Sequence, residues 1–288
     1  MSRLSHDSQW YVSLRGGLGN RVMMLASLLR LHHRSLTAMP TVNWTINEHC
    51  LARFDDLFQP LPDLRLVHGD PEIDTAATPG PQVGSRPPHD PEWEQLGLLE
   101  ESRVLRDEDV QIAFWGWLFH PSDVRRDPRA IRRELARAAR SFRPLPGLLE
   151  GIVRADCLGV HARRTDRSDS LTPGADGRLA EAIRRSGAER IVLATDAPGI
   201  IERLRDLRIE VLCNAPLGLP EEVWPEWSPG DPRRVRREVS VMQAALRDLY
   251  SLSHCRSIVR DVRSTFSQVA AVMGDVNCRT IGGGRRER

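Results

Sequence analysis

The sequence predicts an α/β protein built on parallel sheets, and three observations lead to this fold class. Residues 156–274 alternate between short apolar runs and amphipathic helical patterns, as strands joined by helices do. Near the N-terminus, a glycine turn separates a short apolar strand from a longer apolar helix. The stretch "RPLPG" at 143–147 has the composition of a linker. We therefore expect two α/β halves with a cleft between them.

The N-terminal half begins with the strand, the glycine turn and a helix that is apolar nearly all round and therefore buried. Segment 48–58 spaces Cys50, Phe54 and Phe58 as one face of a helix would. Many prolines and glycines without periodicity predict a long loop at 69–94. The elements expected in this half are strands at 10–14, 41–47 and 110–119 and helices at 20–34 and 128–142.

The C-terminal half is more regular, and its rhythm predicts a parallel sheet covered on both faces. Ser264 or Thr265 is suited to cap the last helix, and Gly274 to end it. The elements expected here are strands at 156–164, 190–196, 209–214 and 256–261, and helices at 177–187, from Pro198 onward, at 236–252 and up to Gly274.

Composition excludes several functional classes. The 288 residues are 40% hydrophobic and 28% charged, with a formal net charge of +2, so no strong field attracts the chain to nucleic acid or membrane. No run reaches the length of about 18 apolar residues that a membrane span needs, and the N-terminus lacks the apolar core of a secretion signal. We expect a cytoplasmic protein with no integral membrane segment and no nucleic-acid partner.

The chain contains no lysine, so all 41 basic residues are arginine. This excludes a P-loop and any enzyme that forms a Schiff base, because both need a lysine amine. An anion must be held by arginine side chains and backbone N–H groups. The five cysteines are odd in number and widely spaced, which favours free thiols over disulfides or structural zinc.

Three segments are candidate anion sites. The turn "GGLGN" at 16–20 lets the backbone approach a phosphate or sugar, although a tight turn without ligand is the alternative. The strand "GVHARR" carries His161, Arg163 and Arg164 to its C-terminal end, where ligands bind in open α/β sheets. A surface salt bridge with a nearby aspartate is the alternative for Arg163. The segment "VRSTF" offers a helix start, which otherwise is an ordinary cap around Ser264.

Two acidic patterns have two interpretations each, ligand binding or ordinary solvent-exposed surface. Asp248 in "RDLYSLSHC" lies on a predicted helix, where its carboxylate is able to accept the N1–H and N2–H of guanine or is simply exposed. Asp107 and Asp109 have the D-x-D spacing of a metal and sugar-nucleotide site, but they lie in a charged turn that favours solvated surface.

Taken in order, the blocks "GGLGNR", "GVHARRTDR", "IVLATD" and "DLYSLSHCRSIVRDVRSTFSQVAAVMG" resemble those of the α1,2-, α1,6- and protein-O-fucosyltransferase superfamily, including the nodulation fucosyltransferases. The resemblance spans most of the chain, and its specificity lies in the ordered set. It implies the GT-B fold, two Rossmann-like domains with an interdomain cleft. Residues 1–147 would form the acceptor-side domain and residues 148–288 the GDP-sugar-binding domain.

The resemblance also implies roles for single residues. Asn20 matches the asparagine of the family's glycine loop near the reacting centre. Arg163 matches the arginine that holds the β-phosphate and stabilises the departing GDP. His161 matches a histidine that contacts the nucleotide, and Asp248 the aspartate that recognises guanine. The donor-binding positions are completed by Gly17, Gly19, Arg164, Ser264, Thr265 and Phe266.

The sequence does not identify a single general base. Some family members have a carboxylate base shortly after the H-x-R-R-x-D block, but the corresponding position here is Leu171. Asp169 and Asp176 lie nearby, and Asp169 is our candidate catalytic carboxylate. The alternative is a reaction that depends largely on stabilising the leaving group.

The resemblance implies an inverting glycosyltransferase that moves a sugar, with fucose expected, from a GDP-sugar donor to a small-molecule or glycan acceptor. Such enzymes require no metal and no cofactor. Two alternatives remain: a metal-dependent transferase that uses another sugar nucleotide, and a non-catalytic module that binds GDP-sugar or glycan.

Overall fold

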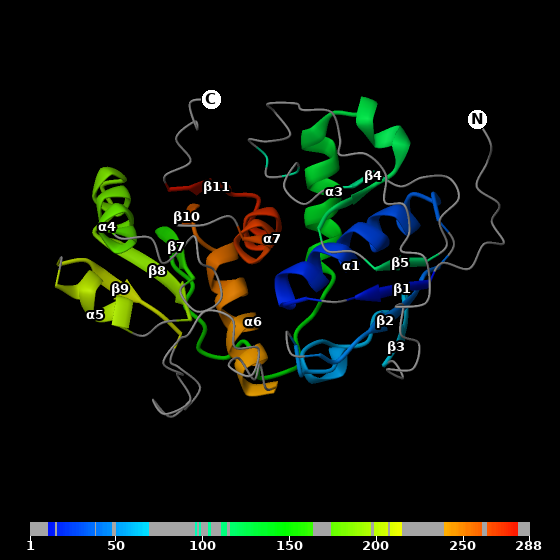
Figure 1. Ribbon diagram of the computed structural model, residues 1–288, viewed down its shortest axis with the longest axis horizontal. Coiled ribbons are helices and arrows are strands. Elements are labelled where there is room, and N and C mark those ends of the chain that lie inside the picture. The colour runs from blue at the N-terminus through cyan, green and yellow to red at the C-terminus, as the bar shows by residue number, and fades with distance from the viewer. Residues whose placement is uncertain are drawn as a thin grey trace. The chain divides into compact units, whose positions relative to one another are not determined.

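The computed structural model divides into two compact units (Figure 1). Unit 1 comprises residues 1–146 with 236–242, and unit 2 comprises residues 147–235 with 243–288. The structure describes residues 11–14, 16–37, 39–47, 50–68, 96, 98, 103–104, 111–113, 116–163, 174–196, 199–206, 208–214, 239–260 and 264–281.

Unit 1 contains a parallel sheet of four strands in the order β3-β2-β1-β5. A separate two-stranded sheet pairs β4 with β6. The predicted strand at 110–119 is therefore two short strands, and Gly116 lies between them at a φ of 130°. The strands are β1 (Tyr11–Leu14), β2 (Thr41–Trp44), β3 (Arg65–Val67), β4 (Arg103–Val104), β5 (Gln111–Ala113) and β6 (Leu118–Phe119).

Helix α1 (Leu18–His33) is the centre of unit 1 and is buried on nearly every face, as its sequence predicts. It packs against α3 (Pro128–Arg140), whose one apolar face contains Ile131 and Leu135. Local sequence explains the start of α3, because the Asp127 carboxylate accepts a hydrogen bond from the Arg129 N–H and proline occupies the first helical position.

The helical spacing of Cys50, Phe54 and Phe58 does not correspond to a continuous helix. The helical part of segment 48–58 among the described residues is a single 3₁₀ turn, η1 (Phe54–Asp56). Phe54 packs edge-on against Trp44 at 5.5 Å between ring centroids and lies 5.1 Å from the ring of Phe58. Aromatic packing buries these side chains without the backbone hydrogen bonds of a longer helix.

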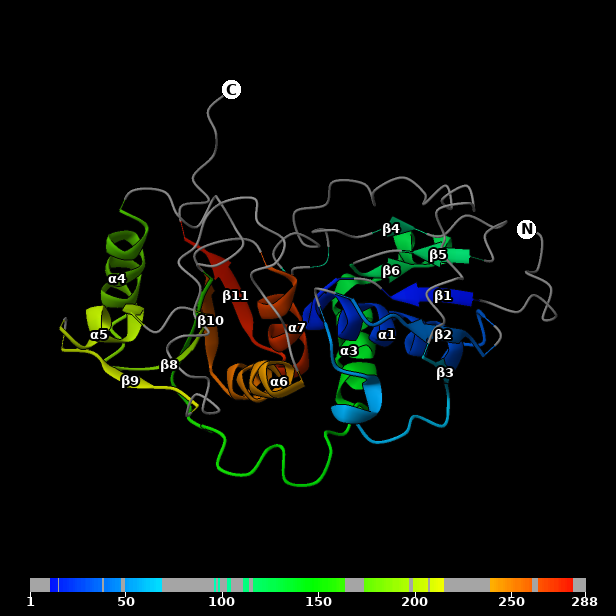
Figure 2. The same ribbon diagram turned by 60° about the horizontal axis from the view of Figure 1, so that its bottom comes forward.

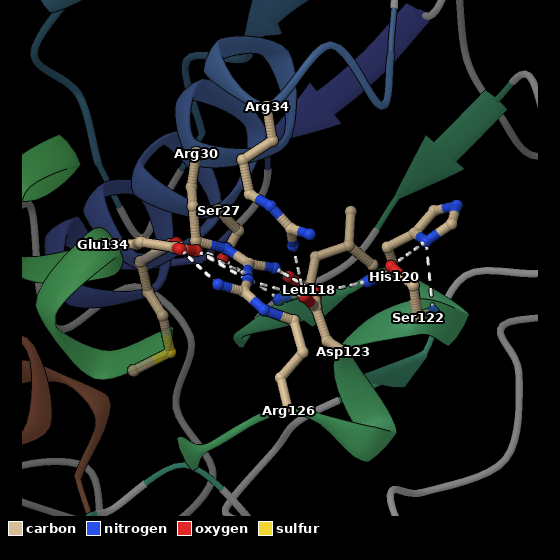
Figure 3. A network of polar contacts seen from close by, with 10 residues as sticks. Ser27, Arg30, Arg34, Leu118, His120, Ser122, Asp123, Arg126 and Glu134 are labelled. Carbon is tan, nitrogen blue, oxygen red and sulfur yellow. Dashed lines mark hydrogen bonds and ion pairs between the residues drawn. The ribbon is translucent and has the colours of Figure 1, made fainter. Parts of the chain in front are cut away.

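A network of ion pairs ties α1 to α3 and to the 3₁₀ helix η2 (Pro121–Arg125), as Figure 3 shows. The fully buried Asp123 carboxylate lies 2.6 Å from Arg30 Nη2 and also pairs with Arg34 and Arg126. Arg126 forms a second pair with Glu134, at 2.5 Å. Burial alone would raise the pKa of Asp123, but its hydrogen bond to Arg30 and the surrounding arginines lower it to about 2.

Unit 2 is a five-stranded parallel sheet in the order β11-β10-β7-β8-β9. Figures 1 and 2 show α4 and α5 on one face of this sheet and α6 and α7 on the other. This confirms the predicted strand and helix alternation. The elements are β7 (Leu158–Ala162), α4 (Ala175–Arg185), β8 (Arg190–Thr195), α5 (Gly199–Arg205), β9 (Glu210–Leu212), α6 (Val239–Ser253), β10 (Ser257–Arg260), α7 (Thr265–Gly274) and β11 (Asn277–Thr280).

The two faces of the unit 2 sheet have different surroundings. Leu158 and Val160 belong to a buried apolar cluster with α4 and α5. Gly159 faces α6 instead, where a Cβ would lie 3.1 Å from atoms of both Leu252 and Cys255. By the period-2 alternation of a strand, the side chain of His161 points to the same face as Gly159. The polar end of β7 is therefore directed toward the α6 and α7 side.

Candidate functional site

The topology of unit 2 points to a binding site at the carboxyl ends of its two neighbouring strands β7 and β10. The chain runs from β7 through α4 to β8 on one side, and from β10 through α7 to β11 on the other. The neighbouring carboxyl ends of β7 and β10 are thus the point where the strand order reverses, and open α/β sheets bind ligands there. His161 of β7 and Arg260 of β10 are register partners at this point.

His161 and Phe266, both expected to bind the nucleotide, lie together at these strand ends. The His161 side chain is buried, and its ring centroid lies 5.2 Å from that of Phe266, with 34° between the ring planes. Phe266 belongs to the first turn of α7. The half-buried Arg163 follows one residue after the end of β7.

The start of α7 has the properties of an anion-binding site. Ser264 is the N-cap, yet its side chain forms no capping hydrogen bond. Its hydroxyl oxygen is buried and has no hydrogen-bond partner among the described residues. The first turn carries no acidic residue, and the first N–H groups of a helix have no partner within the helix. A negatively charged group would be stabilised by these N–H groups and by the helix dipole.

Arg260 holds the α7 start in place, and sequence reasoning missed it. Its Nη1 donates to the Ser264 carbonyl oxygen at 3.0 Å, and its Nε donates to Thr280 Oγ1 of β11 at 2.8 Å. The side chain is buried although it is charged. The signal in the sequence was a charged residue directly after the apolar strand "SIV", which is uncommon unless the charge has a partner.

Asp248 lies on α6 in a separate polar cluster. Its Oδ1 accepts a hydrogen bond of 2.7 Å from Asn214 Nδ2. Asn214 is fixed in turn by the Val153 N–H, which donates to its Oδ1 at 3.1 Å, and by Ser251 Oγ, 3.1 Å from its Nδ2. Burial raises the pKa of Asp248 to about 7, against the lowering effects of Asn214 and Arg247. The carboxyl group is therefore poised between its charged and neutral forms near neutral pH.

The glycine loop, defined as residues 16–20, lies in unit 1 at the carboxyl end of β1. Because β1 pairs with β2 and with β5, this loop also occupies a reversal of strand order. Gly16 has a φ of 85°, and a Cβ there would lie 2.8 Å from Asn20 Nδ2, so a side chain would be excluded. Gly17 is the N-cap of α1 without a side-chain cap, and Gly19 lies in its first turn.

The structure thus places the expected residues in three groups. The first group lies at the carboxyl ends of β7 and β10 in unit 2 and contains His161, Ser264, Thr265 and Phe266. The second is Asp248, which is hydrogen-bonded to Asn214 in the same unit. The third lies in unit 1 and contains Gly17, Gly19 and Asn20. Asp176, in the first turn of α4, forms an ion pair with Arg203. Arg164, Asp169, Asp107 and Asp109 lie outside the described residues.

The described part of the chain contains neither a metal-binding cluster nor a membrane-spanning helix. No cluster of three or more histidine, cysteine, aspartate or glutamate side chains within the described ranges is suited to hold a metal ion. In that same part of the chain, none of the helices combines the length and the apolar character needed to cross a membrane. The five cysteines form no disulfide, and Cys50, Cys157 and Cys255 are buried.

No protein-family model and no curated protein matches the chain. Solved structures do. The fucosyltransferase NodZ from Bradyrhizobium is 18% identical, with 91% of this chain and 92% of NodZ covered and a TM-score of 0.52. A structure of the α-1,6-fucosyltransferase NodZ soaked with GDP-fucose is 16% identical over 92% of each chain, with a TM-score of 0.52.

A third similar structure is a mutant of Arabidopsis thaliana FUT1 in complex with GDP. It is 15% identical, with 96% of this chain and 71% of that chain covered and a TM-score of 0.53. Identities this low establish a shared fold. The chain therefore has the fold of the fucosyltransferases NodZ and FUT1, which confirms the resemblance seen in its sequence at the level of fold.

Proposed function

We propose that this protein is a glycosyltransferase that uses a GDP-sugar, with GDP-fucose as the expected donor. The observation that carries the proposal is the edge of the unit 2 sheet where His161, Phe266 and the uncapped start of α7 lie together. The shared fold supports it, because the NodZ and FUT1 structures contain GDP or were soaked with GDP-fucose. The proposal includes the GT-B arrangement of two Rossmann-like domains.

The diphosphate is assigned to the α7 start and Arg163. The N–H groups of the first turn and the buried Ser264 hydroxyl supply hydrogen-bond donors without an acidic neighbour in that turn. Arg163 supplies a guanidinium, which bonds to phosphate oxygens in a bidentate manner. These groups become more effective as the diphosphate gains negative charge during departure.

The guanine base is assigned to Asp248. A carboxylate accepts both the N1–H and the N2–H of guanine, whereas adenine and uracil do not present this pair of donors. The Oδ1 atom already accepts from Asn214, and a carboxylate oxygen has two lone pairs, so it can accept a second donor. Asn214 thereby fixes the plane of the carboxylate that reads the base.

The proposed reaction is a single in-line displacement. The acceptor oxygen forms a bond to the anomeric carbon, while the bond from that carbon to the β-phosphate oxygen breaks and GDP leaves with both electrons. The acceptor proton goes to a carboxylate base, for which Asp169 remains the candidate. A single displacement inverts the anomeric centre. Arg163 and the α7 dipole supply the positive charge, so we propose that no metal is needed.

GDP release is the measurement that tests this function. Purified protein is incubated in EDTA with GDP-fucose and a panel of oligosaccharides and hydroxyl-bearing peptides, and GDP is quantified. Acceptor-dependent release of GDP, with a new glycosidic bond of inverted configuration by NMR, is the expected result. GDP binding without release from any donor would contradict catalysis and favour a binding module. Activity that EDTA abolishes would contradict the metal-independent mechanism.

A further inference from the structure

Arg21, in the first turn of α1, is fully buried and has no carboxylate partner among the described residues. Its Nε donates to the Gly16 carbonyl oxygen at 2.8 Å, and its Nη2 donates to Asn47 Oδ1 at 3.1 Å. The guanidinium carbon lies 4.8 Å from the ring centroid of Trp44. Its Nη1 is buried and has no hydrogen-bond partner within the described part of the chain. The side chain therefore fixes the glycine loop, and no described carboxylate neutralises its charge.

An unneutralised buried charge is costly for the fold. Removing one ion from water costs several kcal/mol in proteins, and a cation–π contact recovers only about 2 kcal/mol. Burial also lowers the pKa of the Arg21 guanidinium from its ordinary value, with Cys50 acting in the opposite direction. Arg30, the other deeply buried arginine of the same helix, pairs with Asp123 and Glu134. Stability alone would favour the arrangement seen at Arg30.

The first turn of α1, next to Arg21, carries no negative charge either. None of the residues in this turn is acidic, and the N-cap Gly17 has no side chain that could accept hydrogen bonds from the first N–H groups of the helix. The guanidinium, the helix dipole and the first-turn N–H groups all favour an anion near the glycine loop.

We propose that Arg21 is a positioning residue that presets the glycine loop to bind an anionic group, a phosphate or a carboxylate, of the substrate. The guanidinium clamps the loop to Asn47 at one end and provides the charge that the anion neutralises. The inference rests on the proposed function for the identity of the substrate. The anion has two possible sources, the diphosphate of the donor or an acidic group of the acceptor.

The test is an NMR titration of the full chain with inorganic pyrophosphate. In the wild type, we expect the amide signals of Gly17 and Gly19 to shift together with saturation. In Arg21→Gln and Arg21→Met, the apparent Kd at these signals should rise at least tenfold, while the response of the Thr265 and Phe266 amides at α7 is unchanged. If Arg21 had a purely structural role, its substitution would not weaken the response of the glycine loop while leaving that of α7 unchanged.

Arg30→Gln is the matched control, because it also removes a buried arginine from α1. It should lower the thermal midpoint without weakening the response of the glycine loop. The inference is overturned when Arg21→Gln titrates like the wild type, when Arg30→Gln weakens the loop response equally, or when pyrophosphate shifts only the α7 amides of the wild type. Where Arg21→Gln does not fold, Arg21→Met supplies the comparison with the wild type.

Two further titrations identify the source of the anion and separate this inference from the proposed function. Shifts of the glycine loop on addition of GDP assign the anion to the donor. A loop that responds to pyrophosphate in the presence of saturating GDP, but not to GDP itself, assigns it to the acceptor. If no GDP is released from any donor, the proposed function fails, whereas the pyrophosphate titration still decides the role of Arg21.

Discussion

Two buried serines of this protein have opposite surroundings. Ser27 in unit 1 donates to the Met23 carbonyl at 2.9 Å and accepts from the Leu118 N–H at 3.0 Å, beside the paired charges around Asp123. Ser264 in unit 2 is also buried, but its hydroxyl has no hydrogen-bond partner in the part of the chain that the structure describes. Buried polar groups are normally paired. The satisfied network stabilises a fold, and we interpret the unsatisfied group at a strand-order reversal as part of a binding site.

The largest effect that tests the contrast between the paired network and the binding site is on the free energy of unfolding. Asp123→Asn should lower the free energy of unfolding by about 3–5 kcal/mol, because the buried Arg30 then keeps only its longer pair with Glu134, and Arg34 and Arg126 lose a counter-charge as well. The Kd for GDP should stay within about twofold. Chemical denaturation and calorimetric titration measure the two quantities. Glu202→Gln, in an exposed pair with Arg205, is the control and should cost less than about 1 kcal/mol.

The pH dependence has a definite sign at Asp123. Its pKa is about 2 in the folded protein, below the ordinary value of 3.8. The carboxylate therefore contributes stability that is fully present above about pH 4 and is lost as the pH falls toward 2. Asp123→Asn should remove this part of the acid transition, and an unchanged acid transition would contradict the assignment.

Arg163→Ala should have the largest effect on activity. Loss of one preorganised charge at the leaving group lowers the transfer rate by about a hundredfold or more. The thermal midpoint should change little, since the side chain is only half-buried. Arg190→Ala, on an exposed pair with Glu210, should keep the wild-type rate. A rate of Arg163→Ala within tenfold of wild type would remove the residue from the mechanism.

Asp248→Asn should weaken GDP binding about 10- to 100-fold and reduce the preference for GDP over ADP, because an amide does not accept both guanine donors. Wild-type affinity for GDP should fall about tenfold per pH unit below pH 7, as the carboxyl group takes up a proton. The variant should lack this dependence. Calorimetric titrations between pH 5.5 and 8 distinguish the two, and parallel profiles would contradict the role of Asp248.

Asp248 also affects stability, with the opposite sign to Asp123. Its folded pKa of about 7 lies above the ordinary value of 3.8, so the folded state retains a proton that the unfolded state has lost. Stability should therefore decline as the pH rises from about 4 to about 7 and then level off. Asp248→Asn should abolish this decline in denaturation curves recorded across that range.

The smallest effects compare the two serines directly. Ser264→Ala should leave the stability of the ligand-free protein unchanged or slightly higher, yet weaken GDP binding by about 2- to 10-fold, the value of one hydrogen bond. Ser27→Ala should lower stability by about 1–3 kcal/mol with no change in GDP affinity, because it leaves the Leu118 N–H unpaired. Equal behaviour of the two variants would remove the distinction between the two regions.

Local patterns in the sequence predicted most of the fold. The apolar run after the glycine turn became α1, and the Ser264 cap and Gly274 end of α7 lie where the sequence predicts them. Strand β11 was missed because "NCRT" is a half-exposed edge strand without an apolar run. The helical spacing of Cys50, Phe54 and Phe58 is misleading, because aromatic residues at this spacing also pack around a short 3₁₀ turn.

The sequence names candidate site residues one by one, but it does not predict the contacts that support them. Asn214 and Asp248 are 34 residues apart, and Arg30 and Asp123 are 93 apart, so no local pattern joins them. The missing carboxylate at Arg21 is likewise a property of the folded surroundings, because a sequence shows which charges exist but not which of them meet. Spatial pairing, rather than composition, distinguishes Arg30, which pairs with Asp123 and Glu134, from Arg21.

Calorimetric titration of the purified protein with GDP, ADP and UDP, first in EDTA and then with magnesium, tests the central claim most directly. We predict tight binding of GDP alone, of equal strength with and without the metal, and lost in Arg163→Ala. A preference for another nucleotide, or binding that requires magnesium, would contradict a GDP-sugar site formed by Asp248, Arg163 and the start of α7.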